Sequence, residues 1–187
     1  MNTPNKLTVL RISLVPFFVW FLLDRRVSFN FFVAEIIFII ACLTDGLDGK
    51  LARKRGQVTV FGKFFDPLAD KILVLAAFLC FIEMGIISSI PVILILLREF
   101  IVTSIRLVAA ERGIVISANF WGKLKTCSQM ATVIIFISLL NLGNSGIFDN
   151  NYIIFIKNLV IWLCVSITLL SGILYIYKNK DLFKDAA

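Results

Sequence analysis

Four aspartates stand out in this apolar sequence because of their number and spacing: Asp45, Asp48, Asp66 and Asp70. The first two are three residues apart and the last two are four apart, so each pair lies on one face of a helix. Ionisable residues within membrane segments are costly and usually functional. Carboxylates crowded together repel one another unless cations lie between them, and hard ions such as Mg²⁺ or Mn²⁺ prefer oxygen ligands. The pattern predicts a divalent-metal site.

Small residues accompany the carboxylates at helical spacing. Gly49 and Ala52 continue the face of the first pair, and Gly62 lies one turn before the second pair. These positions offer surfaces where a flat or bulky group can approach the backbone, and Arg53 offers a planar fork for phosphate. Two carboxylate pairs on facing helices can hold two metal ions, which clamp an in-line displacement at phosphorus. The predicted substrate is therefore a pyrophosphate or a nucleotide.

A carboxylate is the obvious proton acceptor for such a reaction. The chain contains no histidine, which excludes the commonest general base and the histidine-dependent zinc hydrolases and transferases. Asp70, at the far end of the series, is the best candidate for the base. The cysteines are widely spaced and are interpreted as reduced packing residues; they are Cys42, Cys80, Cys127 and Cys164.

The elements that carry these residues are expected to be membrane helices. The chain has 187 residues, of which 59% are hydrophobic, and its mean hydropathy is +0.94. A soluble domain averages about 45–50% apolar residues. The first apolar run has no small-residue cleavage site behind it, so we expect no cleavable signal peptide.

The sequence predicts an all-α, polytopic membrane protein with six transmembrane helices, preceded by a short interfacial segment at residues 1–6. We expect one membrane domain over residues 1–187. The expected spans are residues 7–23, 29–51, 61–83, 86–108, 120–141 and 152–177.

Lysine and arginine in the connections predict the orientation. One side of the expected bundle collects most of the basic residues, including Lys50, Arg53 and the lysines of the C-terminal tail, whereas Arg25, Arg26 and Lys157 fall on the other. This asymmetry places both termini and the aspartates in the cytoplasm. The net charge of +7 is interpreted as topology plus attraction to anionic membrane lipids, and it gives no support for nucleic acid binding.

Two polar stripes lie in the later spans, toward the same expected cytoplasmic ends. Glu99, Thr103 and Arg106 share a face at i, i+4 and i+7, with Arg98 beside them. In the next span Lys125 shares a face with Ser128, Gln129 and Thr132, and Lys123 precedes it. Buried cations that face a bundle interior indicate an anion-binding chamber. The predicted anion-binding residues are Arg98, Arg106, Lys123 and Lys125.

The aspartate string resembles the signature of the CDP-alcohol phosphotransferase family. It reads Asp45-x2-Asp48-Gly49-x2-Ala52-Arg53-x8-Gly62-x3-Asp66-x3-Asp70, with every fixed position matched. The resemblance implies a six-helix membrane fold, commonly dimeric, with a site open to the cytoplasm. It implies that the four aspartates hold two divalent ions and that Asp70 doubles as the base. It also implies that the cytidine diphosphate contacts Gly49, Arg53, Thr59, Pro4 and Asn5.

Other segments are similar to the phosphatidylglycerophosphate synthases of that family. These segments are Pro4-Asn5-Lys6-Leu7-Thr8-x2-Arg11, Arg98-Glu99-Phe100, Gly122-Lys123-x-Lys125-Thr126 and Ser171-Gly172-x2-Tyr175-x-Tyr177-Lys178. Such enzymes transfer a phosphatidyl group from CDP-diacylglycerol to sn-glycerol 3-phosphate and release CMP. The basic residues fit this acceptor because its phosphate needs cations, whereas serine and neutral inositol do not.

Three alternatives remain open at this point. Two are sister transferases, a cardiolipin synthase of the CDP-diacylglycerol type and an enzyme with an inositol-phosphate acceptor. The third is a divalent-cation transporter that uses the acidic cluster as its pore site. The small residues and Arg53 beside the aspartates argue against a transporter, as does the cytoplasmic bias of the acidic cluster.

Overall fold

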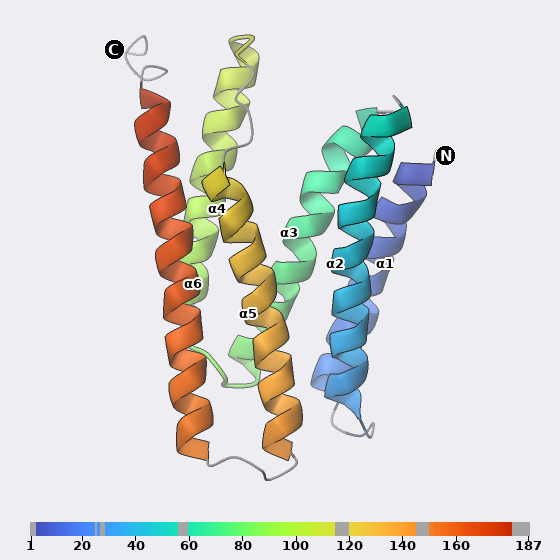
Figure 1. Cartoon of the computed structure of the whole chain (residues 1–187), viewed down its shortest axis with the longest axis vertical. Helices are drawn as coiled ribbons and strands as arrows, with labels where there is room; N and C mark the ends of the chain where they lie inside the picture. Colours follow the sequence, from blue (N-terminus) through green and yellow to red (C-terminus); the bar gives the residue numbers. More distant parts are fainter. Residues whose placement is uncertain are drawn as a thin grey trace. The chain divides into compact units, whose positions relative to one another are not determined.

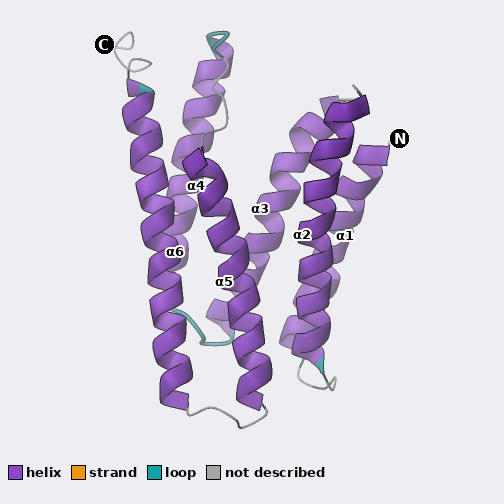
Figure 2. Ribbon diagram, viewed as in Figure 1, coloured by secondary structure: helices purple, strands orange, loops and turns teal. Residues whose placement is uncertain are grey.

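The computed structural model shows six helices in the part of the chain that it describes (Figure 1). The backbone is described for residues 3–24, 26, 29–55, 60–114, 120–144 and 150–180, and the side chains for residues 9–24, 26, 29–44, 71–114, 120–143 and 151–180. The helices are α1 (Thr3–Leu23), α2 (Asn30–Arg55), α3 (Val60–Glu83), α4 (Ser89–Glu111), α5 (Phe120–Asn144) and α6 (Asn150–Lys178). Within these ranges no strand occurs (Figure 2), which confirms the all-α prediction.

The start of the first helix corrects the prediction of a separate interfacial segment at residues 1–6. Helix α1 already begins at Thr3, so Pro4 and Asn5 lie in its first turn. Proline is tolerated there because the first backbone N–H groups of a helix have no intrahelical acceptor. The other five helices lie within a few residues of the expected spans.

The chain divides into two compact units, which share α5 and α6. Unit 1 comprises Met1–Ile86 and Val133–Ile153, and unit 2 comprises Ile87–Thr132 and Ile154–Ala187. In unit 1, α1 packs against α2 and α3. The rings of Phe18 and Phe38 lie 5.6 Å apart between centroids, and those of Phe81 and Phe136 lie 5.3 Å apart. Aromatic packing of this kind stabilises helix contacts beyond simple burial.

Unit 2 has a different interior. Val102, Ile105 and Tyr175 form a buried apolar cluster. Unit 2 also buries polar side chains: Arg98, Lys125, Gln129, Thr132, Thr168 and Ser171. Such residues need partners within the protein, because an unsatisfied polar group in an apolar environment costs several kcal/mol, on the order of 2–7. Two of the predicted anion-binding residues, Arg98 and Lys125, therefore belong to the interior of unit 2.

The outer faces of the helices are apolar. Large hydrophobic side chains exposed on the helices include Phe17, Phe100, Leu163 and Ile173. Among the described residues, two helices are long and apolar enough to cross a membrane, over Phe120–Gly143 and Asn151–Lys178. Helix α4 is apolar as well, but it carries the ionisable residues Arg98, Glu99 and Arg106. The six-span topology and the single domain stay predictions.

Candidate functional site

The aspartates lie on two consecutive helices, as the spacing predicted. Asp45 and Asp48 belong to α2, and Asp66 and Asp70 belong to α3. Their side chains lie outside the described residues, as do those of Pro4, Asn5, Gly49, Ala52, Arg53 and Gly62, and Thr59 lies outside them altogether. Because both backbones are helical, each pair occupies positions on one helix face.

The donor chemistry of this set fits a hard divalent cation. Four carboxylates supply only oxygen ligands, which Mg²⁺ and Mn²⁺ prefer. Among the side chains that the structure describes, no group of three or more His, Cys, Asp or Glu residues could hold a metal ion. The described part of the chain therefore offers no rival to the aspartates as a metal site.

Arg98 is the buried cation of unit 2. It is only 6% exposed, and its two terminal nitrogens donate to different acceptors. Nη1 donates to Glu99 Oε1 at 3.0 Å, and Nη2 donates to Ser171 Oγ on α6 at 2.8 Å. Ser171 Oγ donates in turn to the carbonyl oxygen of Trp121 on α5, at 3.0 Å. Arg98 thus connects α4 to α6 and, through Ser171, to α5.

Glu99 joins Arg98 to Lys125. The Lys125 ammonium, on α5, pairs with the same oxygen, Oε1, that accepts from Arg98. Lys125 is 9% exposed as a residue, and the Glu99 side chain is 13% exposed. A buried ion pair stabilises a protein only when its geometry compensates for lost hydration. Here one carboxylate serves two cations, so the cluster of these three side chains keeps a net charge of +1.

The other two predicted anion-binding residues lie elsewhere on unit 2. Arg106 is exposed; its Nε donates to Tyr175 Oη at 3.3 Å, and its Cζ lies 5.5 Å from the centroid of that ring. Lys123 is also exposed. The described contacts therefore join Arg98 to Lys125 through Glu99, whereas Arg106 contacts Tyr175 on α6.

Three contributors to this cluster had no assigned role in the sequence analysis: Glu99, Ser171 and Gly172. A Cβ atom on Gly172 would lie 2.8 Å from Arg98 Cγ, closer than side chains tolerate. Glycine at this position therefore lets the Arg98 side chain lie against α6. The adjacent Ser171-Gly172 pair in an apolar run was the available signal. Its partner on α4 could not be read from one sequence.

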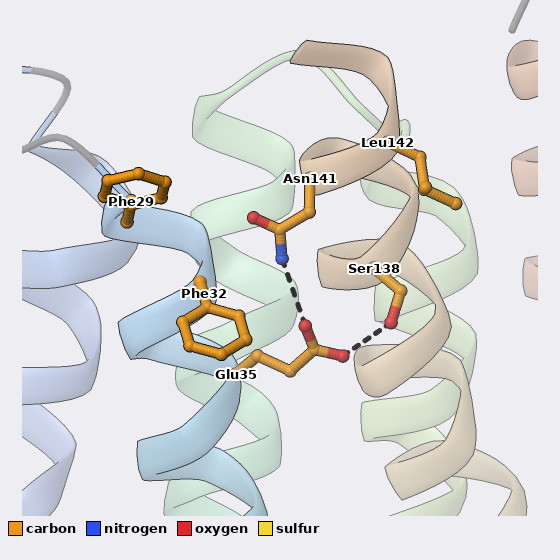
Figure 3. Close-up of a pocket in the computed structure, with 6 residues that line it drawn as sticks. All are labelled: Phe29, Phe32, Glu35, Ser138, Asn141 and Leu142. Carbon is orange, nitrogen blue, oxygen red and sulfur yellow. Dashed lines mark hydrogen bonds between the residues drawn. The ribbon is translucent and has the colours of Figure 1, made fainter. Parts of the chain in front are cut away.

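A second carboxylate, Glu35 on α2, has a contrasting environment in unit 1. Figure 3 shows Ser138 and Asn141 of α5 directed toward it. Ser138 Oγ donates to Glu35 Oε1 at 2.5 Å, and Asn141 Nδ2 donates to Oε2 at 3.0 Å. These residues line an open cavity of about 580 Å³ together with Phe29, Phe32 and Leu142. Glu35 is thus held by neutral donors.

The fold and the motif define a class: an all-helical protein with apolar outer faces and a string of aspartates that suits a divalent metal. The chain belongs to the CDP-alcohol phosphatidyltransferase family, whose model matches residues 1–170. Members of this family are in general dependent on divalent metal ions. Together with the apolar helices, the family identifies a membrane protein and an enzyme.

Curated relatives agree along nearly the whole chain. A Bacillus subtilis protein is 41% identical over 98% of this chain and 97% of its own length. One from Haemophilus influenzae is 37% identical over 98% and 96%, and one from Rickettsia typhi is 34% identical over 97% and 99%. All three are named CDP-diacylglycerol–glycerol-3-phosphate 3-phosphatidyltransferase.

Proposed function

We propose that this protein transfers a phosphatidyl group from CDP-diacylglycerol to sn-glycerol 3-phosphate, giving phosphatidylglycerophosphate and CMP in phospholipid biosynthesis. The observation that carries the proposal is the similarity to relatives of that name over almost their full length. The buried cations of unit 2 support the same acceptor, because a phosphate monoester needs positive partners.

The donor half of the site is assigned to α2 and α3. Asp45, Asp48, Asp66 and Asp70 would hold two Mg²⁺ or Mn²⁺ ions, which would neutralise charge on the diphosphate and stabilise the leaving CMP. Asp70 accepts the proton of the attacking hydroxyl. The acceptor oxygen forms a bond to the phosphatidyl phosphorus as the bond to CMP breaks. The residues assigned to CDP-diacylglycerol are Pro4, Asn5, Gly49, Ala52, Arg53, Thr59 and Gly62.

The acceptor half of the site is assigned to unit 2. Arg98 and Lys125 are the principal ligands of the glycerol 3-phosphate phosphate, because both are buried and already converge on one anionic oxygen. Charge-assisted hydrogen bonds to a phosphate are about twice as strong as neutral ones. Arg106 and Lys123 are assigned secondary, more exposed contacts, where solvent and salt weaken the attraction.

The membrane arrangement follows from the distribution of basic residues. We assign six spans, with both termini and the reacting groups in the cytoplasm, where glycerol 3-phosphate is dissolved. The chain forms one membrane domain and assembles as a homodimer, as the family resemblance implies. Membrane lipids then surround the exposed apolar side chains.

An acceptor panel tests the proposal. Purified protein is given labelled CDP-diacylglycerol and, in separate reactions, glycerol 3-phosphate, phosphatidylglycerol, inositol phosphate or serine. We expect CMP release with glycerol 3-phosphate, dependence on Mg²⁺ or Mn²⁺, and loss of activity in excess EDTA or in Asp66→Asn. A preference for phosphatidylglycerol or inositol phosphate would reassign the acceptor, and full activity in EDTA would overturn the metal assignment.

A further inference from the structure

The charges around Glu99 lead to an inference about ligand binding that goes beyond the assignment of the acceptor's phosphate to Arg98 and Lys125. Two buried cations, Arg98 and Lys125, share one carboxylate oxygen. Removing the Glu99 carboxylate from these three side chains would leave two positive charges together in an apolar interior, where an isolated charge is very unfavourable. In the absence of an anionic ligand, Glu99 therefore helps to keep Arg98 and Lys125 inside unit 2.

Arg98 is also held by contacts that do not involve Glu99. Ser171 accepts from Nη2 at 2.8 Å, and Gly172 leaves room for the aliphatic part of the side chain. Within the described residues, the buried Nε of Arg98 has no hydrogen-bond acceptor. Buried donors are nearly always paired. This donor therefore points to an acceptor that the resting cluster does not supply.

A phosphate group matches these donors better than the carboxylate does. Glu99 presents one oxygen, Oε1, to both cations, whereas a phosphate monoester has three terminal oxygens. Arginine offers five N–H donors in a fixed fork and lysine offers three. A phosphate can therefore bond to the Arg98 fork and to the Lys125 ammonium through different oxygens.

We propose that Glu99 is a built-in competitor of the acceptor's phosphate: its carboxylate holds Arg98 and Lys125 in the resting enzyme and is displaced when the phosphate binds. The inference rests on the proposed function, since it takes a phosphorylated alcohol as the ligand. Because every anion has to displace the same carboxylate, Glu99 raises the concentration that each anion needs to bind. A phosphate monoester, with about −1.5 to −2 charges at pH 7, attracts the two cations more strongly than a phosphodiester with one charge, so it overcomes this competition more readily.

The test compares three forms of the full-length protein in detergent: wild type, Glu99→Gln and Glu111→Gln. Glu111 is the matched control because it is an exposed carboxylate on the same helix. Thermal unfolding is followed by tryptophan fluorescence while sn-glycerol 3-phosphate, inorganic phosphate or glycerol is titrated without CDP-diacylglycerol. We expect Glu99→Gln to unfold at a lower temperature without ligand.

Both phosphate compounds should then stabilise Glu99→Gln at a half-saturating concentration about tenfold lower than in wild type, the change expected from one charge-assisted hydrogen bond. The KM for glycerol 3-phosphate should fall with it. Glycerol should do nothing, and Glu111→Gln should match wild type. An equal or higher half-saturating concentration in Glu99→Gln would show that the carboxylate does not compete with phosphate.

A second variant covers the case in which Glu99→Gln does not fold. Glu99→Asp keeps the charge but shortens its reach by one methylene, so it should shift the half-saturating concentration in the same direction by a smaller factor. If neither variant folds even in saturating phosphate, Glu99 is part of the scaffold and the inference is wrong. If wild type instead uses another phosphorylated alcohol, and Glu99→Gln binds that compound more tightly, the proposed function fails and the competition stands.

Discussion

The two carboxylates Glu35 and Glu99 show how differently one residue type is used in the two units. Both lie on a helix and accept hydrogen bonds from α5. Glu35 accepts from a hydroxyl and an amide, which are neutral. Glu99 accepts from a guanidinium and an ammonium, which are charged. The contacts of Glu35 link α2 to α5. The contacts of Glu99 hold two cations in an apolar interior.

The positive charge that Arg98 and Lys125 keep around Glu99 is the feature that indicates a function. An arginine cannot lose its proton in a protein, so Arg98 stays cationic wherever it is buried. If two helices only had to be held together, neutral donors around one carboxylate would suffice, as Ser138 and Asn141 around Glu35 show in unit 1. Around Glu99, by contrast, Arg98 and Lys125 share a single carboxylate, which leaves one positive charge for an anionic ligand.

The largest expected effect is the loss of stability when Glu99 is removed. Glu99→Leu should lower the free energy of unfolding by about 3–5 kcal/mol, because two cations lose their shared anion. Glu99→Leu combined with Lys125→Leu should recover much of that loss, since the cluster returns to a net charge of +1. Equilibrium unfolding in detergent without phosphate measures both variants. A double variant that is no more stable than Glu99→Leu would show that Arg98 and Lys125 do not depend on a shared anion.

The next effect concerns the position of Arg98. Gly172→Ala places a Cβ atom 2.8 Å from Arg98 Cγ, near the base of the side chain, so the whole guanidinium must move away from Ser171. We expect the KM for glycerol 3-phosphate to rise about tenfold or more, with a smaller change for CDP-diacylglycerol. Gly143→Ala is the control, because its Cβ atom would meet Ile153 Cδ1 at an ordinary 3.6 Å. Equal KM values in the two variants would remove Arg98 from the acceptor site.

A smaller difference separates the buried and exposed cations. Lys125→Ala should raise the KM for glycerol 3-phosphate about tenfold, which corresponds to one charge-assisted contact. Arg106→Ala should raise it about threefold, because Arg106 is exposed and screened by solvent. Lys178→Ala, at the exposed end of α6, serves as the control. A larger effect at Arg106 than at Lys125 would move the phosphate toward Tyr175.

The positions of the helices could be predicted from the sequence, whereas the contacts between their side chains could not. Long apolar runs predict where helices lie, and five of the six expected spans lie within a few residues of α2 to α6. The start of α1 was wrong because Pro4 was interpreted as preceding the helix, although proline fits a first helical turn. Helical periodicity placed Glu99 and Arg106 on one stripe, but it cannot say which neighbouring helix that stripe faces.

The contacts of the site therefore required the structure. Arg98 and Arg106 both lie on α4, yet one contacts Ser171 and the other contacts Tyr175, four residues further along α6. Helical spacing placed Glu99 on a polar stripe of α4, but it could not identify a partner for the carboxylate on another helix. The importance of Glu99 comes from Lys125, 26 residues away in the chain. The roles of the aspartates stay predictions, since their side chains lie outside the described residues.

The smallest effect is expected at Glu35, where the charge itself should matter little. In Glu35→Gln the amide oxygen can accept from Asn141, and the new NH₂ group can donate to Ser138 Oγ, whose hydroxyl rotates freely. Both contacts survive, so the free energy of unfolding should change by less than about 1 kcal/mol. Glu35→Ala removes both acceptors and should lower it by about 1–2 kcal/mol.

The same unfolding measurements, with KM for glycerol 3-phosphate recorded alongside, check the comparison between the units. Both Glu35 variants should keep the wild-type KM, because their contacts hold only α2 to α5. If Glu35→Gln destabilised the protein as much as Glu99→Leu does, the charge of Glu35 would be essential. A cation would then have to balance it, and the aromatic rings of Phe29 and Phe32 beside the carboxylate in Figure 3 would be the place to look for it.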